Sequence, residues 1–262
     1  SQLAGRLIEK GQRLRNHLLA TPANVPWLEC LTSGLDQPGA VSMTLRGHTE
    51  AVLSVAISQD GTRLLSGSAD NSMRMWDLRT GEELTQFTGH RRSVTDVKMS
   101  PDGTVAVSCS IDGTVRIWDV ASGKQMSVLT GHSVGVAAID LSADGRLVVS
   151  AGWSGQMLAW TVPEGRLVFE ISAEHDSTTG VSGLAHGKLS TEPNRFQSAG
   201  SANDICISPC GGMALVGFND RRVGLLRMSG ESSPHWQASY GGHIARVHCV
   251  ACLSDGQSFL SG

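Results

Sequence analysis

The dipeptide Gly-His recurs in this chain at a constant interval of 42 residues, at Gly47-His48, Gly89-His90 and Gly131-His132. A tryptophan follows each copy at a fixed distance, at Trp76, Trp118 and Trp160. Apolar stretches and Asp-Gly turns fill the interval, as in "SVTDVKMSPDGTVAVSCSIDGTVRIWD". A period of this length is typical of modular arrays, so the chain is expected to fold as a series of similar units.

Each unit is predicted to consist of β-strands. Runs of Val, Ile, Leu and Ser end at turns such as Asp60-Gly61, Asp102-Gly103 and Asp144-Gly145, which is the pattern of strands joined by tight turns. No segment within the repeats sustains the 3.6-residue period of a helix. Strands such as "LLSGSA" and "TVAVSCS" are apolar on both sides, which indicates sheets packed between two neighbouring sheets.

The spacing and the progression from Gly-His to Trp-Asp resemble WD-repeat β-propellers over residues 41–262. The resemblance implies an all-β fold with blades near 48–88, 90–130, 132–173 and 175–241, and an incomplete blade at 243–262. The fourth blade departs from the pattern, with Glu174-His175 in place of Gly-His, Leu226 in place of tryptophan, and an insertion at 177–203. About four and a half blades are expected to belong to a larger ring, completed by missing blades of a longer chain or by a second copy.

Residues 1–40 lie outside the repeat. Leu3, Leu7, Leu14 and Leu18 have helical spacing before Thr21-Pro22, which predicts a short amphipathic helix. The stretches "QLAGRLI", "PWLECLTSGLDQPG" and "TLRGHTEAVLSVAIS" resemble the junction between the helical region and the propeller of NACHT/WD-repeat signalling ATPases of the STAND class. That resemblance implies an upstream nucleotide-binding module. The simpler interpretation, a terminal helix that packs on the propeller, remains open.

A Ser, His and Asp set within the repeats is compatible with a nucleophilic triad. However, the set recurs every 42 residues, whereas an active site normally occurs once, and WD repeats are similar in having a structural network of these residue types. We therefore predict a structural role, no enzymatic activity and no cofactor. By position the network comprises His48, Ser66, Asp70, Trp76, His90, Ser108, Asp112, Trp118, His132, Ser150 and Trp160. The third repeat carries Ser154 where aspartate is expected, so its turn is predicted to be held less firmly.

The six cysteines include "CISPC" and "CVAC", which invite a metal interpretation. Cys249 and Cys252 are predicted to share a strand, where a separation of three residues sends side chains to opposite faces. Zinc needs ligands that converge, so we expect reduced thiols and no metal site. The aspartates of the Asp-Gly pairs are likewise expected to be turn residues rather than acid–base groups or calcium ligands.

The segment "VSGLAHGKLS", residues 181–190, superficially resembles a phosphate-binding loop. A Walker loop needs glycine at the position of Ser182 and a hydroxyl residue at the position of Leu189, so both requirements fail. The segment falls inside the 177–203 insertion. It is interpreted there as a solvated loop, or as part of a partner-binding surface.

The charge pattern bears on partners and location. The net charge is −3 and the cations are dispersed, so nucleic acid is an unfavoured partner. No apolar run approaches the length of a membrane span, and no signal-peptide pattern opens the chain. These features predict a cytoplasmic protein that does not enter a membrane.

A partner is expected to bind at the end of the sheets that carries the loops leading into the first strand of each blade. If each histidine reaches its aspartate, these loops and the turns before the third strands share one rim, which we name the His face. A protein or peptide is expected to bind there through Glu50, Arg91, Arg92, Ile111, Trp153 and Asn219. Tryptophan with arginine is a hot-spot composition, although Trp153 could instead pack over its own blade. The predicted function is a non-enzymatic scaffold, possible contexts being the ligand-sensing or autoinhibitory propeller of a signalling ATPase or an RNA/ribonucleoprotein-associated scaffold.

Overall fold

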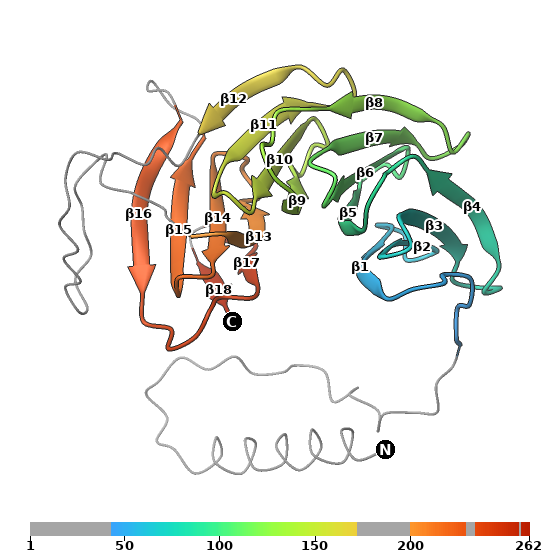
Figure 1. Ribbon diagram of the computed structural model, residues 1–262, viewed down its shortest axis with the longest axis horizontal. Helices are drawn as coiled ribbons and strands as arrows, with labels where there is room; N and C mark the ends of the chain where they lie inside the picture. The colour runs from blue at the N-terminus through green and yellow to red at the C-terminus, as the bar shows by residue number, and fades with distance from the viewer. Residues whose placement is uncertain (1–42, 172–199, 229–233, 257) are drawn as a thin grey trace, which may run out of the picture. The chain divides into compact units, whose positions relative to one another are not determined.

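The computed structural model describes residues 43–171, 200–228, 234–256 and 258–262 (Figure 1). The predicted helix in residues 1–40, His175 and the segment 181–190 lie outside these ranges. The described residues from Leu45 to Gly262 belong to one compact unit. They form four antiparallel four-stranded sheets and one two-stranded sheet, so the prediction of repeated all-β units is confirmed.

The strands follow the chain in order within every sheet. The first sheet contains β1 (Val52–Ile57), β2 (Arg63–Ser68), β3 (Ser72–Asp77) and β4 (Glu83–Thr88). The second contains β5 (Val94–Met99), β6 (Val105–Ser110), β7 (Val115–Asp119) and β8 (Gln125–Leu129). The third contains β9 (Val136–Leu141), β10 (Leu147–Gly152), β11 (Met157–Thr161) and β12 (Leu167–Ile171). The fourth contains β13 (Ala202–Ile207), β14 (Met213–Phe218), β15 (Arg222–Arg227) and β16 (His235–Gly241), and the fifth contains β17 (Val250–Cys252) and β18 (Phe259–Ser261).

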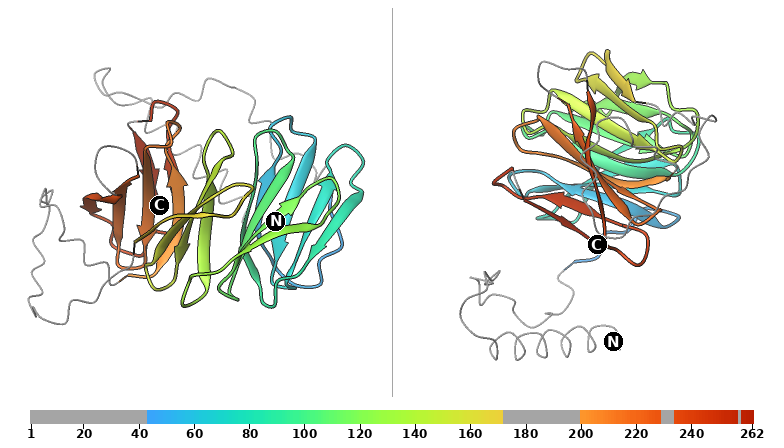
Figure 2. Two further views of the ribbon diagram at one scale, coloured as in Figure 1. Left: turned by 90° about the horizontal axis from the view of Figure 1, so that it is seen from above. Right: turned by 90° about the vertical axis from the view of Figure 1, so that its left-hand side faces the viewer.

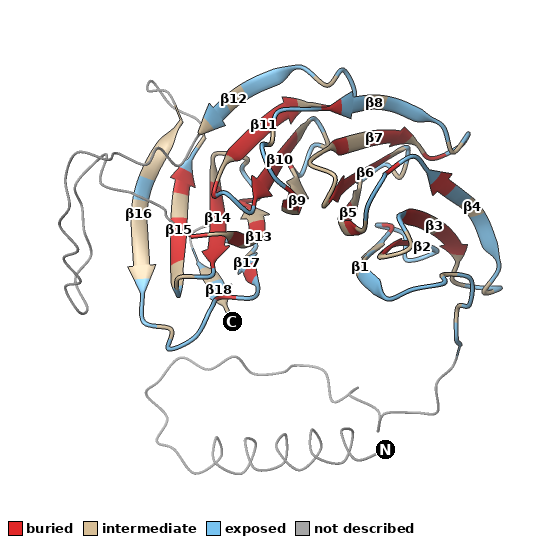
Figure 3. Ribbon diagram, in the orientation of Figure 1, coloured by how far each residue is buried: buried red, intermediate tan, exposed pale blue. Residues whose placement is uncertain are grey.

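The first strands of successive sheets lie side by side on the inside of an arc, and the fourth strands lie on the outside (Figure 1). Figure 2 shows the same sheets stacked face to face along the arc. The second strands, sandwiched between neighbouring sheets, are the most completely buried, whereas β4, β8 and β12 are largely exposed (Figure 3). The predicted burial of strands on both faces is therefore found in β2, β6, β10 and β14.

Apolar side chains between the sheets form the core. Between the first two sheets, Leu65 and Met73 pack with Val94 and Val97. Gly67 of β2 allows this close approach, because a Cβ there would lie 2.7 Å from a methyl of Val97 and 2.8 Å from one of Val94. A side chain at this position would force the two sheets apart.

The Asp-Gly pairs form the turns between first and second strands, as predicted. Asp60 accepts hydrogen bonds from the Ser58 hydroxyl (2.5 Å) and the Thr62 amide (3.0 Å), and Gly61 has a φ of 70°, in the left-handed region that glycine adopts without strain. These hydrogen bonds lower the pKa of Asp60 to about 2, and the bond from Ser58 has the largest effect.

The fourth sheet differs from its prediction where its first strand begins, and it agrees with the prediction at Leu226. Strand β13 begins at Ala202, so the last two residues assigned to the 177–203 insertion belong to the strand. Leu226 is fully buried at the position of the repeat tryptophan and is paired across the sheet with Trp236 of β16. The indole of Trp236 on β16 thus lies next to Leu226 on β15, which is smaller than the tryptophan of the other repeats.

Candidate functional site

A hydrogen-bond network joins the loop that enters each of the first two sheets to the turn before its third strand. In the first sheet, His48 Nδ1 lies 2.8 Å from Asp70 Oδ2 and His48 Nε2 lies 2.8 Å from Ser66 Oγ. Trp76 donates its indole N–H to Ser66 Oγ at 2.8 Å. Since a carboxylate only accepts, Nδ1 carries the proton and Nε2 accepts from the serine.

The second sheet repeats this geometry. His90 lies 3.0 Å from Asp112 and 2.7 Å from Ser108, and Trp118 donates to Ser108 at 2.9 Å. The Arg91 amide also donates to Asp112, at 2.9 Å. The structure therefore brings together all eight residues that the sequence assigned to the first two networks.

Burial and hydrogen bonding act in opposite directions on the aspartates. Burial alone would raise the pKa of Asp112, but hydrogen bonds from Thr114, the Arg91 amide and His90 hold it well below its ordinary value. Burial lowers the pKa of His90 despite its carboxylate partner. In the second sheet at neutral pH, the ionised Asp112 thus accepts from a neutral His90.

The third sheet has a different network because Ser154 replaces the aspartate. His132 Nε2 still lies 2.6 Å from Ser150 Oγ, and the His132 ring stands edge-on to Trp160 with centroids 6.0 Å apart. His132 Nδ1, however, is buried without a hydrogen-bond partner. Burial lowers the pKa of His132 to about 4, against a weaker opposing effect of the Glu170 charge.

Gln156 replaces part of the missing aspartate, a role that the sequence pattern did not reveal. Its side-chain oxygen accepts from the Ser133 amide at 3.3 Å, the counterpart of the bond from the Thr49 amide to Asp70. Its amide group also donates to the Gly131 carbonyl at 3.2 Å. The signal available in the sequence was the substitution of a longer amide at the position of Ser72 and Thr114.

The fourth and fifth sheets depart further from the pattern. Asp220 accepts a hydrogen bond from Arg222 Nε at 2.8 Å. The corresponding aspartates of the first two sheets, Asp70 and Asp112, pair with histidines. In the fifth sheet, His243 Nε2 lies 2.8 Å from Ser261 Oγ. This histidine–serine pair was not assigned from the sequence.

The predicted partner-binding residues lie on the His face, which the structure defines by the loops before β1, β5, β9 and β17 and the turns before β3, β7, β11 and β15. Glu50, Arg91, Arg92, Trp153 and Asn219 are exposed, and Ile111 is half-buried. A hollow of 390 Å³ brings three of them together: Arg92, Ile111 and Trp153. Glu50, Arg91 and Asn219 do not line it.

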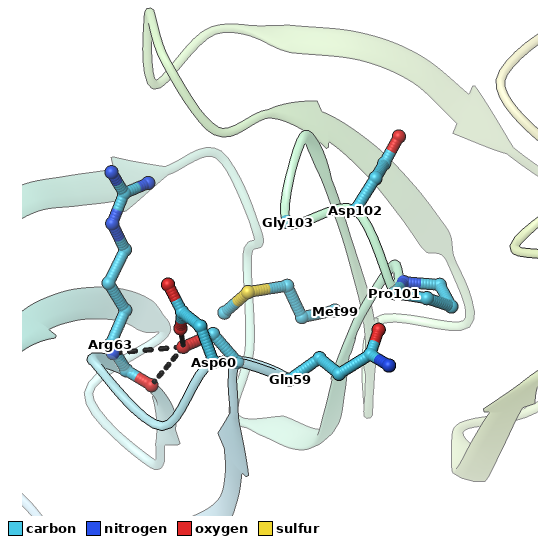
Figure 4. A pocket seen from close by; sticks show the side chains of 8 residues that line it. Gln59, Asp60, Arg63, Met99, Pro101, Asp102 and Gly103 are labelled. Atoms are coloured by element: carbon cyan, nitrogen blue, oxygen red, sulfur yellow. Dashed lines mark hydrogen bonds between the residues drawn. The ribbon is translucent and has the colours of Figure 1, made fainter.

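A second hollow, of 380 Å³, lies on the opposite end of the sheets, which carries the Asp-Gly turns and is named the Asp-Gly face. Figure 4 shows Gln59, Asp60 and Arg63 of the first sheet facing Met99, Pro101 and Asp102 of the second. The polar group of Asp60 is already engaged within its own turn. The Asp60 carboxylate is therefore not available to a ligand in this hollow.

The cysteines are free thiols in the described part of the chain. Strand β17 begins at Val250, so the prediction that Cys249 and Cys252 share a strand is wrong: Cys249 precedes it and is exposed. Cys252 instead contacts Cys206 of the neighbouring sheet, donating its amide to that sulfur at 3.1 Å. No group of three or more potential metal ligands occurs among the described residues, and no helix in those ranges is long and apolar enough to cross a membrane.

Comparison with known proteins assigns a family to the repeats. The family described as "WD domain, G-beta repeat" matches residues 39–77, 81–119 and 123–161. The chain is similar to the Notchless protein homolog of Arabidopsis thaliana, with 56% identity over 39 residues, which covers 15% of this chain and 8% of the relative. It is also similar to the small ribosomal subunit protein RACK1 of Candida albicans, with 45% identity over 58 residues, which covers 22% of this chain and 18% of the relative.

A third relative is subunit I of eukaryotic translation initiation factor 3 from Schizosaccharomyces pombe, 46% identical over 41 residues, or 16% of this chain and 12% of the relative. Each match thus spans less than a fifth of the relative's own length. The second and third family matches each run from the outer strand of one sheet through the first three strands of the next. Residues 39–161 of the chain thus carry WD repeats, and the series of four-stranded antiparallel sheets agrees with a WD-repeat β-propeller.

Proposed function

We propose that this chain is a non-enzymatic scaffold that binds a protein or peptide through its His face. The observation that carries the proposal is the hollow in which Arg92, Ile111 and the exposed Trp153 converge. Rigid sheets position these loop residues, and function in such folds resides in the loops. WD repeats, and similarity to proteins of ribosomal and initiation-factor assemblies, agree with an interaction role.

The geometry of the Ser-His-Asp sets supports the non-enzymatic part of the proposal. Ser66 and Ser108 are buried, and each hydroxyl receives an indole N–H from the repeat tryptophan. A nucleophile must be reachable by its substrate, and these hydroxyls are enclosed between neighbouring strands. The same arrangement in two successive sheets is also what a structural element requires.

A finer proposal is that the propeller senses a ligand or restrains assembly in a NACHT/WD-repeat signalling ATPase. It rests on the sequence resemblance of the first fifty or so residues alone. A Walker motif encoded upstream of Ser1 in the same gene would support it, and a gene without one would contradict it. A cytoplasmic location is part of the proposal and rests on the sequence pattern described above.

Site-specific photo-crosslinking tests the binding face. The photoreactive amino acid p-benzoylphenylalanine replaces Glu50 on the His face or Gln59 on the Asp-Gly face, both exposed, and each variant is irradiated in an extract of the source organism. Discrete crosslinked products from position 50, and none from position 59, are expected. Products only from position 59, or from neither, would contradict the proposal.

The second candidate function is an RNA- or ribonucleoprotein-associated scaffold, which is favoured by the names of the ribosomal and initiation-factor relatives. Phosphate contacts release counterions, so the affinity for RNA would fall steeply with salt concentration. Measuring the affinity of the chain for single-stranded RNA at several salt concentrations separates the candidates. A steep slope supports this second function, and a lack of RNA binding removes it.

A further inference from the structure

The two ends of the sheets differ in charge. Exposed arginines on the His face come from the second, fourth and fifth sheets, and the free carboxylate opposing them is Glu50; these arginines are Arg91, Arg92, Arg221 and Arg246. Other carboxylates of this face have local partners: Asp70 has His48, Asp112 has His90, Asp220 has Arg222 and Glu170 has Gln156. Asp70 and Asp112 stay ionised, because their pKa values are held low, so the exposed arginines of the His face lie beside carboxylates that keep their charge.

Carboxylates recur in the turns of the Asp-Gly face in the first, second, third and fifth sheets: Asp60, Asp77, Glu82, Asp102, Asp119, Asp144, Glu164 and Asp255. Fewer cations accompany them, namely Arg63, Arg79, Lys124, Arg146, Arg166 and Arg227. The Asp-Gly face is therefore the less suitable end for a negatively charged partner, because like charges oppose association.

The hollow on the His face adds an apolar anchor to this charge. Trp153 is 43% exposed and Val134 beside it 42% exposed, and the half-buried Ile111 completes the apolar wall. The Trp153 amide donates to the Gly135 carbonyl at 3.0 Å. A Cβ on Gly135 would lie 2.9 Å from ring atoms of Trp153, so the indole rests against the loop and needs glycine beneath it.

The interpretation that Trp153 packs over its own sheet is met on one side of the ring, and its role in partner binding stays a prediction. One side of the ring packs over its own sheet, while a large part of the ring stays open to solvent. A ring that is already fixed in place loses little conformational entropy when a partner covers it. This is the property of an anchoring residue at an interface.

Arg92 supplies the charge within the hollow. Its backbone carbonyl accepts from Ser110 at 2.9 Å, which fixes the loop, while its guanidinium forms no hydrogen bond or ion pair with any residue in the described ranges. The nearby Asp112 carboxylate is engaged by His90, the Arg91 amide and Thr114. The Arg92 guanidinium is therefore free to pair with a carboxylate from outside the chain.

We propose that this hollow binds an acidic peptide segment, which lays one bulky apolar side chain on Trp153 and Val134 and pairs a carboxylate with Arg92. The inference rests on the proposed function and names the class of partner. An aromatic ring next to two aliphatic side chains suits an apolar side chain, and arginine suits a carboxylate. Single-stranded nucleic acid would instead need a continuous track of cations and stacking platforms, and here one aromatic residue lines the hollow.

The probe is a set of fluorescein-labelled peptides of the form Gly-Asp-Glu-X-Glu-Asp-Gly, with X as each of the twenty amino acids, titrated against the full chain by fluorescence anisotropy. Peptides with Leu, Ile, Met or Phe at X are expected to bind more tightly than the peptide with Ala. Trp153→Ala and Arg92→Glu should each weaken binding by about tenfold or more, as truncation of a hot-spot residue does. Replacing the acidic residues of the peptide with Asn and Gln should have a comparable effect.

Matched control variants separate a local effect from general damage. Leu167→Ala removes an exposed apolar side chain from β12 of the same sheet, and Arg79→Glu reverses an exposed charge on the Asp-Gly face. Both should bind the peptides as the unmodified chain does. Far-ultraviolet circular dichroism and thermal unfolding verify that every variant is folded.

Three results would overturn the inference. Absence of binding across the peptide set removes it, and crosslinking at position 50 would then show whether the His face still binds another kind of protein. Binding that survives Trp153→Ala and Arg92→Glu places the peptide elsewhere. Tighter binding of a single-stranded RNA through the same two residues, with a steep salt dependence, would replace the peptide by nucleic acid.

Discussion

At the scale of single residues, the His, Ser, Asp and Trp side chains fasten each turn to the loop beside it. In the second sheet, Asp112 accepts from His90, the Arg91 amide and Thr114 at 3.0, 2.9 and 2.6 Å. Removal of one partner from a buried network leaves the others unsatisfied. The loss of stability caused by removing one residue of the network therefore depends on how many groups lose a hydrogen-bond partner.

Asp112→Ala is expected to lower the free energy of unfolding by about 2 kcal/mol, because each buried group left unpaired costs about 1–3 kcal/mol. Chemical denaturation and thermal unfolding measure the loss. Asp102→Ala, an exposed turn aspartate of the same sheet, is the matched control and should cost less. Equal effects of the two substitutions, or an unchanged melting curve for Asp112→Ala, would contradict a stabilising role for the network.

The third sheet allows the reverse experiment. Ser154→Asp combined with Gln156→Thr recreates the residues of the second sheet and gives His132 Nδ1 an acceptor that it lacks. A satisfied hydrogen bond contributes about 1 kcal/mol, so the double variant should unfold at a higher denaturant concentration. Ser154→Ala serves as the control that changes the turn without supplying an acceptor. A double variant no more stable than this control would show that Gln156 already compensates fully.

The stability difference between the unmodified chain and the double variant is expected to depend on pH. The pKa of His132 is about 4, below its ordinary value of 6.5, so the unfolded state binds more protons between these values. Stability due to neutral His132 is therefore present above pH 6.5 and lost as the pH falls toward 4. An aspartate partner raises the histidine pKa, so S154D/Q156T should lose less stability over this window. Denaturation series across this window test it, and parallel pH profiles for the two proteins would disprove it.

At the scale of strands and sheets, inner-strand aspartates connect one sheet to the next. Asp96 of β5 accepts from the Ser54 hydroxyl of β1 at 2.6 Å and from the Ile139 amide of β9 at 3.1 Å. Asp140 and Asp204 likewise accept amides of the following inner strand, at 2.7 and 2.8 Å. These carboxylates satisfy N–H groups on strand edges that no neighbouring ladder pairs.

Asp96→Ala should therefore weaken the contacts of three sheets at once. The expected loss is about 2 kcal/mol or more, since two backbone amides and one hydroxyl lose their acceptor. Ser54→Ala removes only one donor and is the control, with a smaller expected loss. Denaturant unfolding followed by tryptophan fluorescence measures both, and similar losses would show that the bridge to β9 contributes little.

The sequence predicted the interactions that recur within each repeat, and it missed the contacts between residues of different sheets. His48, Ser66, Asp70 and Trp76 could be aligned with their counterparts because each set lies within one unit at a fixed spacing. The bridges of Asp96 and the contact between Cys206 and Cys252 join residues of different units, for which a local pattern carries no signal. The role of Gln156 was missed because it replaces an interaction rather than repeating one.

At the scale of the whole described unit, the first sheet differs from the others in what covers it. Val94 and Val97 of β5 are fully buried against the preceding sheet, and Val136 and Ile139 of β9 are buried in the same way. Their counterparts on β1 are exposed: Val52 at 49% and Val55 at 57%. Ile57 on the same strand is 60% exposed. A contiguous apolar face of this kind marks a surface that another structural element is expected to cover.

The exposed β1 face predicts that the 262-residue chain associates in a concentration-dependent manner. Burial of apolar surface contributes about 25 cal/mol per Å², so the face should pair with a second copy or with a further sheet supplied in trans. Sedimentation velocity is expected to show larger species as concentration rises, and Val55→Ser with Ile57→Ser should shift the distribution toward the monomer. Leu84→Ser and Met126→Ser, exposed apolar positions on the outer strands β4 and β8, are the matched controls and should leave it unchanged. Association that persists in the β1 variant but is lost in the outer-strand control would place the contact on the outer strands, where exposed apolar side chains alternate with polar ones.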